Sequence, residues 1–117
     1  QALGLNKCSN KIKIGEVDKT CREYISQNGF ANEFNHSTGH GIGLDVHEPP
    51  WIRANNKELL INNMTITVEP GIYFESKYGV RIEDSIIIDS NKKTGIINFN
   101  KFDKDLIIIW VWKGKTI

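Results

Sequence analysis

The stretch HSTGHGIGLDVHEPP, residues 36–50, holds all three histidines of the chain, interleaved with three glycines. Glycine is among the poorest helix formers, so three glycines this close argue strongly against a helix. An HExxH zinc site needs two histidines on one helical face, and His36 and His40 are therefore not expected to form one. Glycines beside a histidine instead let another backbone or a ligand approach closely. The stretch predicts an extended segment that carries a site.

Helical periodicity is confined to the first part of the chain. GEVDKTCREYISQNG, residues 15–29, predicts a helix, and Gly29 stands where a glycine would end it. Residues 1–9 fit the end of an earlier helix. Beyond Gly29 apolar and polar residues alternate, which is typical of strands with one buried face. The sequence therefore predicts an α+β fold, with helices first and a mostly antiparallel sheet after them, in one piece.

Three segments carry the alternation, and they are GLDVHE (43–48), MTITVEP (64–70) and GVRIEDSIII (79–88). Pro49-Pro50 is expected to end the first strand, because proline lacks the N–H that a sheet ladder uses. Asn62-Asn63 is expected to form a turn, since Asn tolerates positive φ. The apolar run DLIIIWVW (105–112) predicts a buried strand or a short terminal element; an exposed run would be an aggregation-prone edge or an oligomer contact.

Composition excludes several classes of protein. Fifteen basic and fourteen acidic side chains leave a net charge of +1, which gives no footprint for nucleic acid or an anionic membrane. No apolar run approaches the roughly 20 residues of a membrane helix. Cys8 and Cys21 lack CxxC spacing, so two reduced thiols in a cytoplasmic protein are expected. No signal peptide is expected, and a chain that opens on Gln1 is expected to be a piece of a longer protein.

Two carboxylates extend the histidine stretch into a candidate metal site. Glu69 follows the strand TITV, and Glu83 lies within GVRIED. If they converge with His40, one imidazole and two carboxylates would suit Mn²⁺, Co²⁺, Zn²⁺ or Fe²⁺. Taken singly, each has an ordinary alternative: a structural histidine, a solvated glutamate, or an Arg81–Glu83 surface pair worth under about 1 kcal/mol. The combination favours a site, because a buried charge needs a partner or a metal.

The motifs HSTGHGIGLDVHE, TVEPGIYF and GVRIEDSIII, in this order, resemble those of the Xaa-Pro peptidases, namely aminopeptidase P and prolidase. These enzymes belong to the pita-bread (creatinase/aminopeptidase) metallopeptidase family, which includes methionine aminopeptidase. The similarity runs from Glu16 to about Ile109. It implies a partial pita-bread fold and hydrolysis of the peptide bond before proline, at the second position of the substrate, by a metal-bridging hydroxide.

The resemblance also implies roles for individual residues. His40, Glu69 and Glu83 would be metal ligands, with Glu83 bridging two divalent ions, Mn²⁺ first and Co²⁺ or Zn²⁺ as alternatives. Glu69 would also move the proton of the nucleophile to the leaving proline nitrogen. The remaining catalytic residues implied are those that hold substrate and stabilise the intermediate: His36, His47 and Arg81.

The family supplies two further aspartate ligands, and neither Asp18, in the predicted helix, nor Asp45, in the histidine stretch, matches them. Residues 1–117 are therefore expected to be the C-terminal portion of a catalytic domain, without its first ligand-bearing strands or an N-terminal domain. Such a fragment is expected to be inactive alone. The full-length protein is expected to be a cytoplasmic homodimer.

Two alternatives remain open. Methionine aminopeptidases carry a Gln-x-Glu-His motif where this chain has Arg81-Ile82-Glu83-Asp84. A pita-bread domain that serves only as a binding module tends to lose its ligands, whereas His40, Glu69 and Glu83 are all present. The sequence does not separate aminopeptidase P from prolidase, nor does it name the physiological metal.

Overall fold

The computed structural model describes residues 1–109 as two helices and seven strands. No helix within this part of the chain is long and apolar enough to cross a membrane. The helices are α1 (Ala2–Lys7) and α2 (Ile14–Gln27); the strands are β1 (Gly39–Gly41), β2 (Glu48–Ile52), β3 (Thr65–Val68), β4 (Gly71–Phe74), β5 (Tyr78–Arg81), β6 (Asp84–Ile88) and β7 (Ile96–Asn98).

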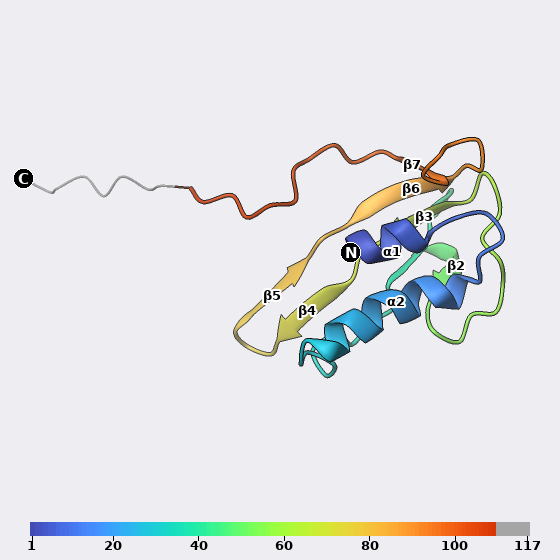
Figure 1. Ribbon diagram of the computed structural model, residues 1–117. Coiled ribbons are helices and arrows are strands. Elements are labelled where there is room, and N and C mark those ends of the chain that lie inside the picture. Colours follow the sequence, from blue (N-terminus) through green and yellow to red (C-terminus); the bar gives the residue numbers. More distant parts are fainter. Residues whose placement is uncertain (110–117) are drawn as a thin grey trace, which may run out of the picture.

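The strands form a five-stranded sheet in the order β2-β1-β3-β6-β7 and a two-stranded sheet of β4 and β5, and every pairing is antiparallel. In the β3–β6 ladder Val68 lies opposite Asp84, and in the β4–β5 ladder Gly71 lies opposite Arg81. The two ladders continue one register. They make one long ribbon, interrupted at residues 69–70 and 82–83, from which β4 and β5 extend beyond the main sheet (Figure 1).

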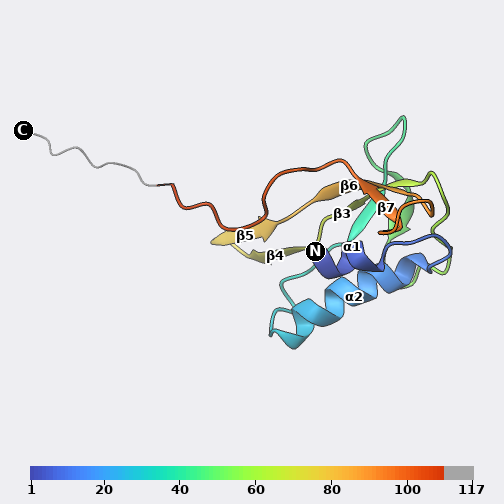
Figure 2. The ribbon, with the colours of Figure 1, turned by 45° about the horizontal axis from the view of Figure 1, so that its top comes forward.

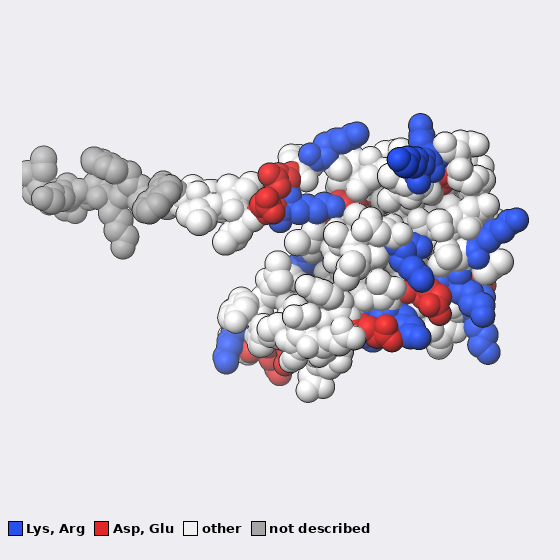
Figure 3. All heavy atoms as spheres, viewed as in Figure 1, with Lys and Arg blue, Asp and Glu red and all other residues white. Residues whose placement is uncertain are grey.

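Both helices lie on one side of the five-stranded sheet (Figure 2). The core lies between the helices and the sheet. The central strands contribute every second residue to it, because side chains of a strand point to opposite faces in turn. Its fully buried members from β3 and β6 are Ile66, Val68, Ile86 and Ile88. The same alternation turns Thr67 and the following Glu69 toward the face away from the helices. On the face of the molecule that Figure 3 shows, basic and acidic side chains are interspersed.

Several predictions of local structure are confirmed. Helix α2 occupies the predicted range, and Gly29 follows its end at φ 88°. The strand predicted in residues 64–70 is β3, preceded by a turn in which Asn63 has φ 70°. The long segment 79–88 is divided between β5 and β6, because the ribbon is interrupted at residues 82–83.

The strand predicted for residues 43–48 is wrong over residues 43–47. These residues form an exposed loop between β1 and β2, in which Leu44 and Val46 are 105% and 71% exposed, and Glu48 is the first residue of β2. The alternation in the loop has no apolar face to pack against, so the pattern alone does not make it a strand. Pro49-Pro50 does not end a strand either, since both prolines lie within β2. β2 is an edge strand, where a missing N–H is tolerated.

The buried strand predicted for residues 105–112 is also wrong over its described part. Residues 105–109 form no strand and are exposed, and residues 110–117 lie outside the described range. The segment leaves the sheet after β7. Before the apolar run, Lys104 forms an ion pair with the buried Asp84 at the start of β6. The run therefore begins directly after a residue that is bound to the sheet.

Candidate metal centre

The glycines around His40 are required by the packing of β1 between two neighbouring strands. A Cβ atom on Gly39 would overlap the backbone carbonyl of Thr67, and one on Gly41 would overlap the carbonyl of Pro49. Any larger residue would force β1 away from β3 or β2. The glycines thus let the histidine strand lie deep in the sheet, and His40 is only 9% exposed.

His40 is held in one orientation by hydrogen bonds. Its backbone N–H donates to Thr67 Oγ1 at 3.0 Å, and its Nδ1 lies 2.9 Å from the carbonyl oxygen of Gly41. Because a carbonyl oxygen only accepts, Nδ1 carries the hydrogen. In a neutral ring Nε2 is then an acceptor, and it lies 3.0 Å from Glu69 Oε1. Two acceptors at this separation need a proton or a cation between them, so the donor set fits a divalent metal.

The ladders stop at the pair Val68–Asp84 and resume at the pair Gly71–Arg81, and their shared register, continued across this interruption, brings Glu69 and Glu83 to facing positions. Directly opposed carboxylates on one face of a sheet repel each other unless a cation lies near them. Glu69 is 7% exposed and accepts a hydrogen bond from Thr67 Oγ1 at 2.8 Å, whereas Glu83 is exposed. Burial of one member makes the need for a counter-charge greater.

These side chains line one cavity of about 330 Å³ on the face away from the helices. Its lining residues are His40, Ile42, Gly43, Leu44, Val46, His47, Thr67, Glu69, Arg81 and Glu83. The structure thus brings five of the six predicted site residues to one cavity. His47 reaches it from the exposed loop, with its ring centre 4.4 Å from that of His40. His36 does not line this cavity.

His36 is connected to the cavity through a tyrosine that the sequence interpretation missed. Arg81 lies 3.6 Å from Glu69 Oε2 through Nη1, and its Nε–H donates to the Tyr73 hydroxyl at 2.7 Å. The hydroxyl is 3.1 Å from His36 Nε2. Since His36 Nδ1 lies 2.7 Å from the Ser37 carbonyl and so carries the ring hydrogen, the tyrosine donates to Nε2. A signal for Tyr73 existed in EPGIY, where strand alternation places it on the same face as Glu69.

The described residues include no group of three or more His, Cys, Asp or Glu side chains arranged to hold one ion. His40 and Glu69 are in contact, and Glu83 lines the same cavity. The two other aspartates considered above lie elsewhere. Asp18 is fully buried in α2, and Asp45 is exposed in the loop.

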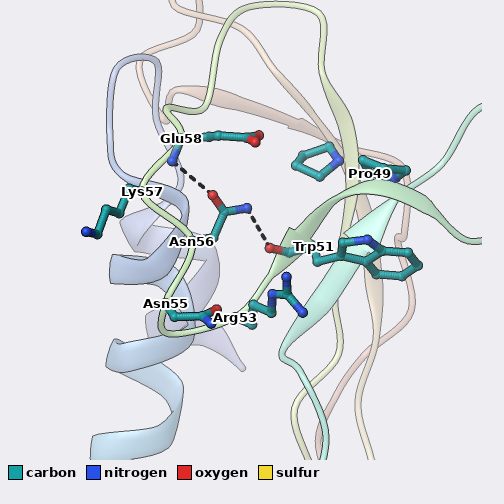
Figure 4. A pocket seen from close by; sticks show the side chains of 8 residues that line it. Pro49, Trp51, Arg53, Asn55, Asn56, Lys57 and Glu58 are labelled. Atoms are coloured by element: carbon teal, nitrogen blue, oxygen red, sulfur yellow. Dashed lines mark hydrogen bonds between the residues drawn. The ribbon is translucent and has the colours of Figure 1, made fainter.

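A larger cavity of about 450 Å³ lies beside the end of β2 and the loop after it (Figure 4). The Asn56 side chain closes one side of it: its amide donates to the Trp51 carbonyl, and its oxygen accepts from the Glu58 N–H, both at 2.9 Å. No predicted site residue lines this cavity. The candidate ligands His40, Glu69 and Glu83 therefore lie at the smaller cavity and not at this one.

Comparison with known proteins matches the chain to metallopeptidases. Residues 1–90 match the family described as "Metallopeptidase family M24". A putative Xaa-Pro aminopeptidase of Mycoplasma pneumoniae is 45% identical over 89 residues, which are 76% of this chain and 25% of that protein. The chain thus spans about a quarter of the length of this curated relative.

Two solved structures extend the comparison to the fold. The Xaa-Pro dipeptidase from Bacillus anthracis superposes with a TM-score of 0.85 at 42% identity, over 92% of this chain and 30% of that one. An X-prolyl aminopeptidase from Caenorhabditis elegans, described as a cytosolic enzyme with a di-nuclear active site, superposes with a TM-score of 0.59 at 30% identity. That match covers 80% of this chain and 17% of the other.

Proposed function

The chain belongs to metallopeptidase family M24 and has part of its α+β pita-bread fold, and we propose that it is part of an Xaa-Pro peptidase. The activity of that enzyme would depend on two metal ions. The substrate would be a peptide with proline at its second position. The proposal includes both aminopeptidase P and prolidase, because relatives described as aminopeptidases and as dipeptidases match the chain to a similar extent.

One observation carries this proposal: the contact of His40 Nε2 with Glu69 Oε1 at 3.0 Å, in a cavity that Glu83 also lines. We assign His40, Glu69 and Glu83 as the ligands that this chain contributes to two divalent ions. Manganese is the first candidate, with cobalt or zinc as alternatives. Bound there, the ions would supply Lewis-acid polarisation of the scissile carbonyl and activation of water at neutral pH.

The chain's own residues then have separate tasks. Glu69 would accept a proton and return it to the leaving nitrogen, a role that suits a carboxylate held in place by Thr67 and Arg81. Arg81, fixed by its bond to Tyr73, and His47, at the cavity edge, would orient the peptide. His36 would hold the substrate and stabilise the intermediate from outside the cavity, beside the Tyr73 hydroxyl that its Nε2 contacts.

Two other functions have less support. A methionine aminopeptidase would not account for the Xaa-Pro specificity in the descriptions of the relatives reported above. A binding module would not need the His40–Glu69 arrangement. We also propose that the chain is a C-terminal portion of the catalytic domain, inactive without two further aspartates. The whole protein is proposed as a cytoplasmic homodimer; the cytosolic relative from Caenorhabditis elegans supports the location.

The test is a calorimetric titration of Mn²⁺ into the chain and into His40→Gln and Glu69→Gln variants. Asp45→Asn is the matched control, since it removes an exposed carboxylate beside the cavity that is not an assigned ligand. We expect saturable binding by the unmodified chain and the control, and its loss in the other two. Binding that survives both substitutions, or that is absent from the unmodified chain, would overturn the assignment.

A further inference from the structure

Helix α2 contains an ion pair between a buried carboxylate and a partly exposed arginine, which the site described above does not use. Asp18 is fully buried, and Arg22 lies one turn later on the same helical face. Arg22 Nε and Nη2 each donate to one carboxylate oxygen of Asp18 at 3.0 Å. This fork-to-fork geometry fixes the guanidinium plane.

The guanidinium also binds the main chain that leads to the histidine strand. Nη1 donates to the carbonyl of Phe34 at 2.9 Å, and Nη2 donates to the carbonyl of His36 at 2.8 Å. The guanidinium carbon lies 4.2 Å from the centre of the Phe34 ring. Arg22 therefore fixes two carbonyls on either side of residue 35, and with them the point where the His36 side chain leaves the backbone.

Asp18 binds the same segment two residues further on. Its Oδ1 accepts the Thr38 hydroxyl at 2.9 Å and shares the Thr38 N–H, at 3.1 Å, with the carbonyl of Ile52, which lies at 2.9 Å. The carbonyl of Thr38 in turn accepts the N–H of Glu69 at 2.7 Å. The ion pair is thus connected through Thr38 to the backbone of Glu69, and Thr38 is separated from His40 only by Gly39.

A neighbouring ion pair shows that helix stabilisation alone does not explain this arrangement. Lys19 and Glu23 have the same i, i+4 spacing on the same helix, at 3.8 Å, with side chains 56% and 57% exposed. An exposed pair of this kind contributes little to stability. The Asp18–Arg22 pair differs because four hydrogen bonds from it reach a segment outside the helix.

We propose that Asp18 and Arg22 are positioning residues that hold His36, His40 and Glu69 in register with the cavity, an inference that rests on the function proposed above. They touch no reacting atom. Their action is to fix backbone groups from which those three side chains project. Partners behind the ligands of a metal site typically change metal affinity about 10- to 100-fold when they are removed.

The experiment compares Arg22→Met, Arg22→Lys and Asp18→Asn with Lys19→Met as the matched control. Amide hydrogen exchange is followed at Thr38 and Glu69, with Ile87 in the β3–β6 ladder as an internal reference. Mn²⁺ affinity is measured on the same samples. Arg22→Lys keeps the positive charge but loses the paired N–H groups of the guanidinium. It therefore tests the same contacts if Arg22→Met does not fold.

We expect the Arg22 and Asp18 variants to lose protection at Thr38 and Glu69 by about 10-fold or more relative to Ile87, and to bind Mn²⁺ about 10- to 100-fold more weakly. Lys19→Met should change neither. Equal loss of protection at all three amides would show a purely global effect and overturn the proposal, as would unchanged exchange. If the unmodified chain bound no Mn²⁺, the proposed function would fail, while the exchange comparison would still decide the positioning role.

Discussion

Thr67 binds both residues of the central contact: its hydroxyl oxygen accepts the backbone N–H of His40 at 3.0 Å and donates to Glu69 Oε1 at 2.8 Å. A single buried hydroxyl therefore sets the position of an imidazole from one strand and a carboxylate from the next. Because all three groups are buried, none of these hydrogen bonds can be replaced by solvent without a change in the local structure.

Thr67→Val, which keeps the side-chain shape, should lower the free energy of unfolding by about 1–3 kcal/mol, since it leaves a buried N–H and a buried carboxylate without their partner. It should also weaken Mn²⁺ binding. Thr65→Val is the control, because Thr65 lies on the same face of β3, two residues earlier. Urea denaturation and metal titration check both effects; equal stability of the two variants would contradict the role of Thr67.

Glu83→Gln should cost more activity and metal than Arg81→Lys. The first change weakens a ligand proposed to be shared by both ions, while lysine keeps the charge and loses only the fork that reaches Tyr73 and Glu69. Metal content is measured on this chain, and hydrolysis of an Xaa-Pro peptide is measured on the whole protein. Full metal loading and near-normal turnover in Glu83→Gln would refute the bridging role.

The 117-residue chain alone is expected to hydrolyse no Xaa-Pro peptide at a meaningful rate. Within the described residues, the cavity is lined by two carboxylates, Glu69 and Glu83, whereas a pair of ions needs the two further aspartates that the resemblance implies. The assay uses purified monomer with Mn²⁺ or Co²⁺, an Xaa-Pro dipeptide and a longer Xaa-Pro peptide. Robust turnover would mean that the site is complete within this chain.

Cys8 should be unreactive in the folded chain. Burial, together with the nearby Cys21, raises the pKa of the Cys8 thiol from 9.0 to about 12. Iodoacetamide at pH 8 should therefore label Cys8 only after unfolding in urea, which is the positive control. The folded state keeps a proton that the unfolded state loses above pH 9, so stability should fall as the pH rises from 9 toward 12. Rapid labelling of the folded chain, followed by peptide mapping, would contradict this.

The sequence correctly predicted those helices and strands whose periodic apolar residues pack against the core. Helix α2 and strand β3 each have an apolar face that meets the same core, so periodicity located them correctly. Residues 43–47 show the limit of that method, because Leu44 and Val46 alternate as in a strand but no element covers them. Whether an apolar face meets a partner depends on the tertiary arrangement, which periodicity does not contain.

The candidate site was predicted from motifs, and the geometry added what motifs do not encode. His40, Glu69 and Glu83 were named from the sequence, and the structure places them at one cavity. Tyr73 was missed because a tyrosine in a strand ordinarily indicates packing. Asp18 was set aside as a metal ligand because it lies in the predicted helix, and its contact with Thr38, twenty residues away in the chain, was not foreseen.

The register shared by the two ladders of the ribbon makes the tip of the β4–β5 hairpin a suitable place for an insertion. Glu69 and Glu83 lie between the pairs Val68–Asp84 and Gly71–Arg81, so the length of the turn does not set their separation. Ser76, at φ 58°, lies in that turn. Evolution can lengthen or shorten the tip, and an experimenter can graft an affinity tag or a fluorophore there, without displacing either carboxylate.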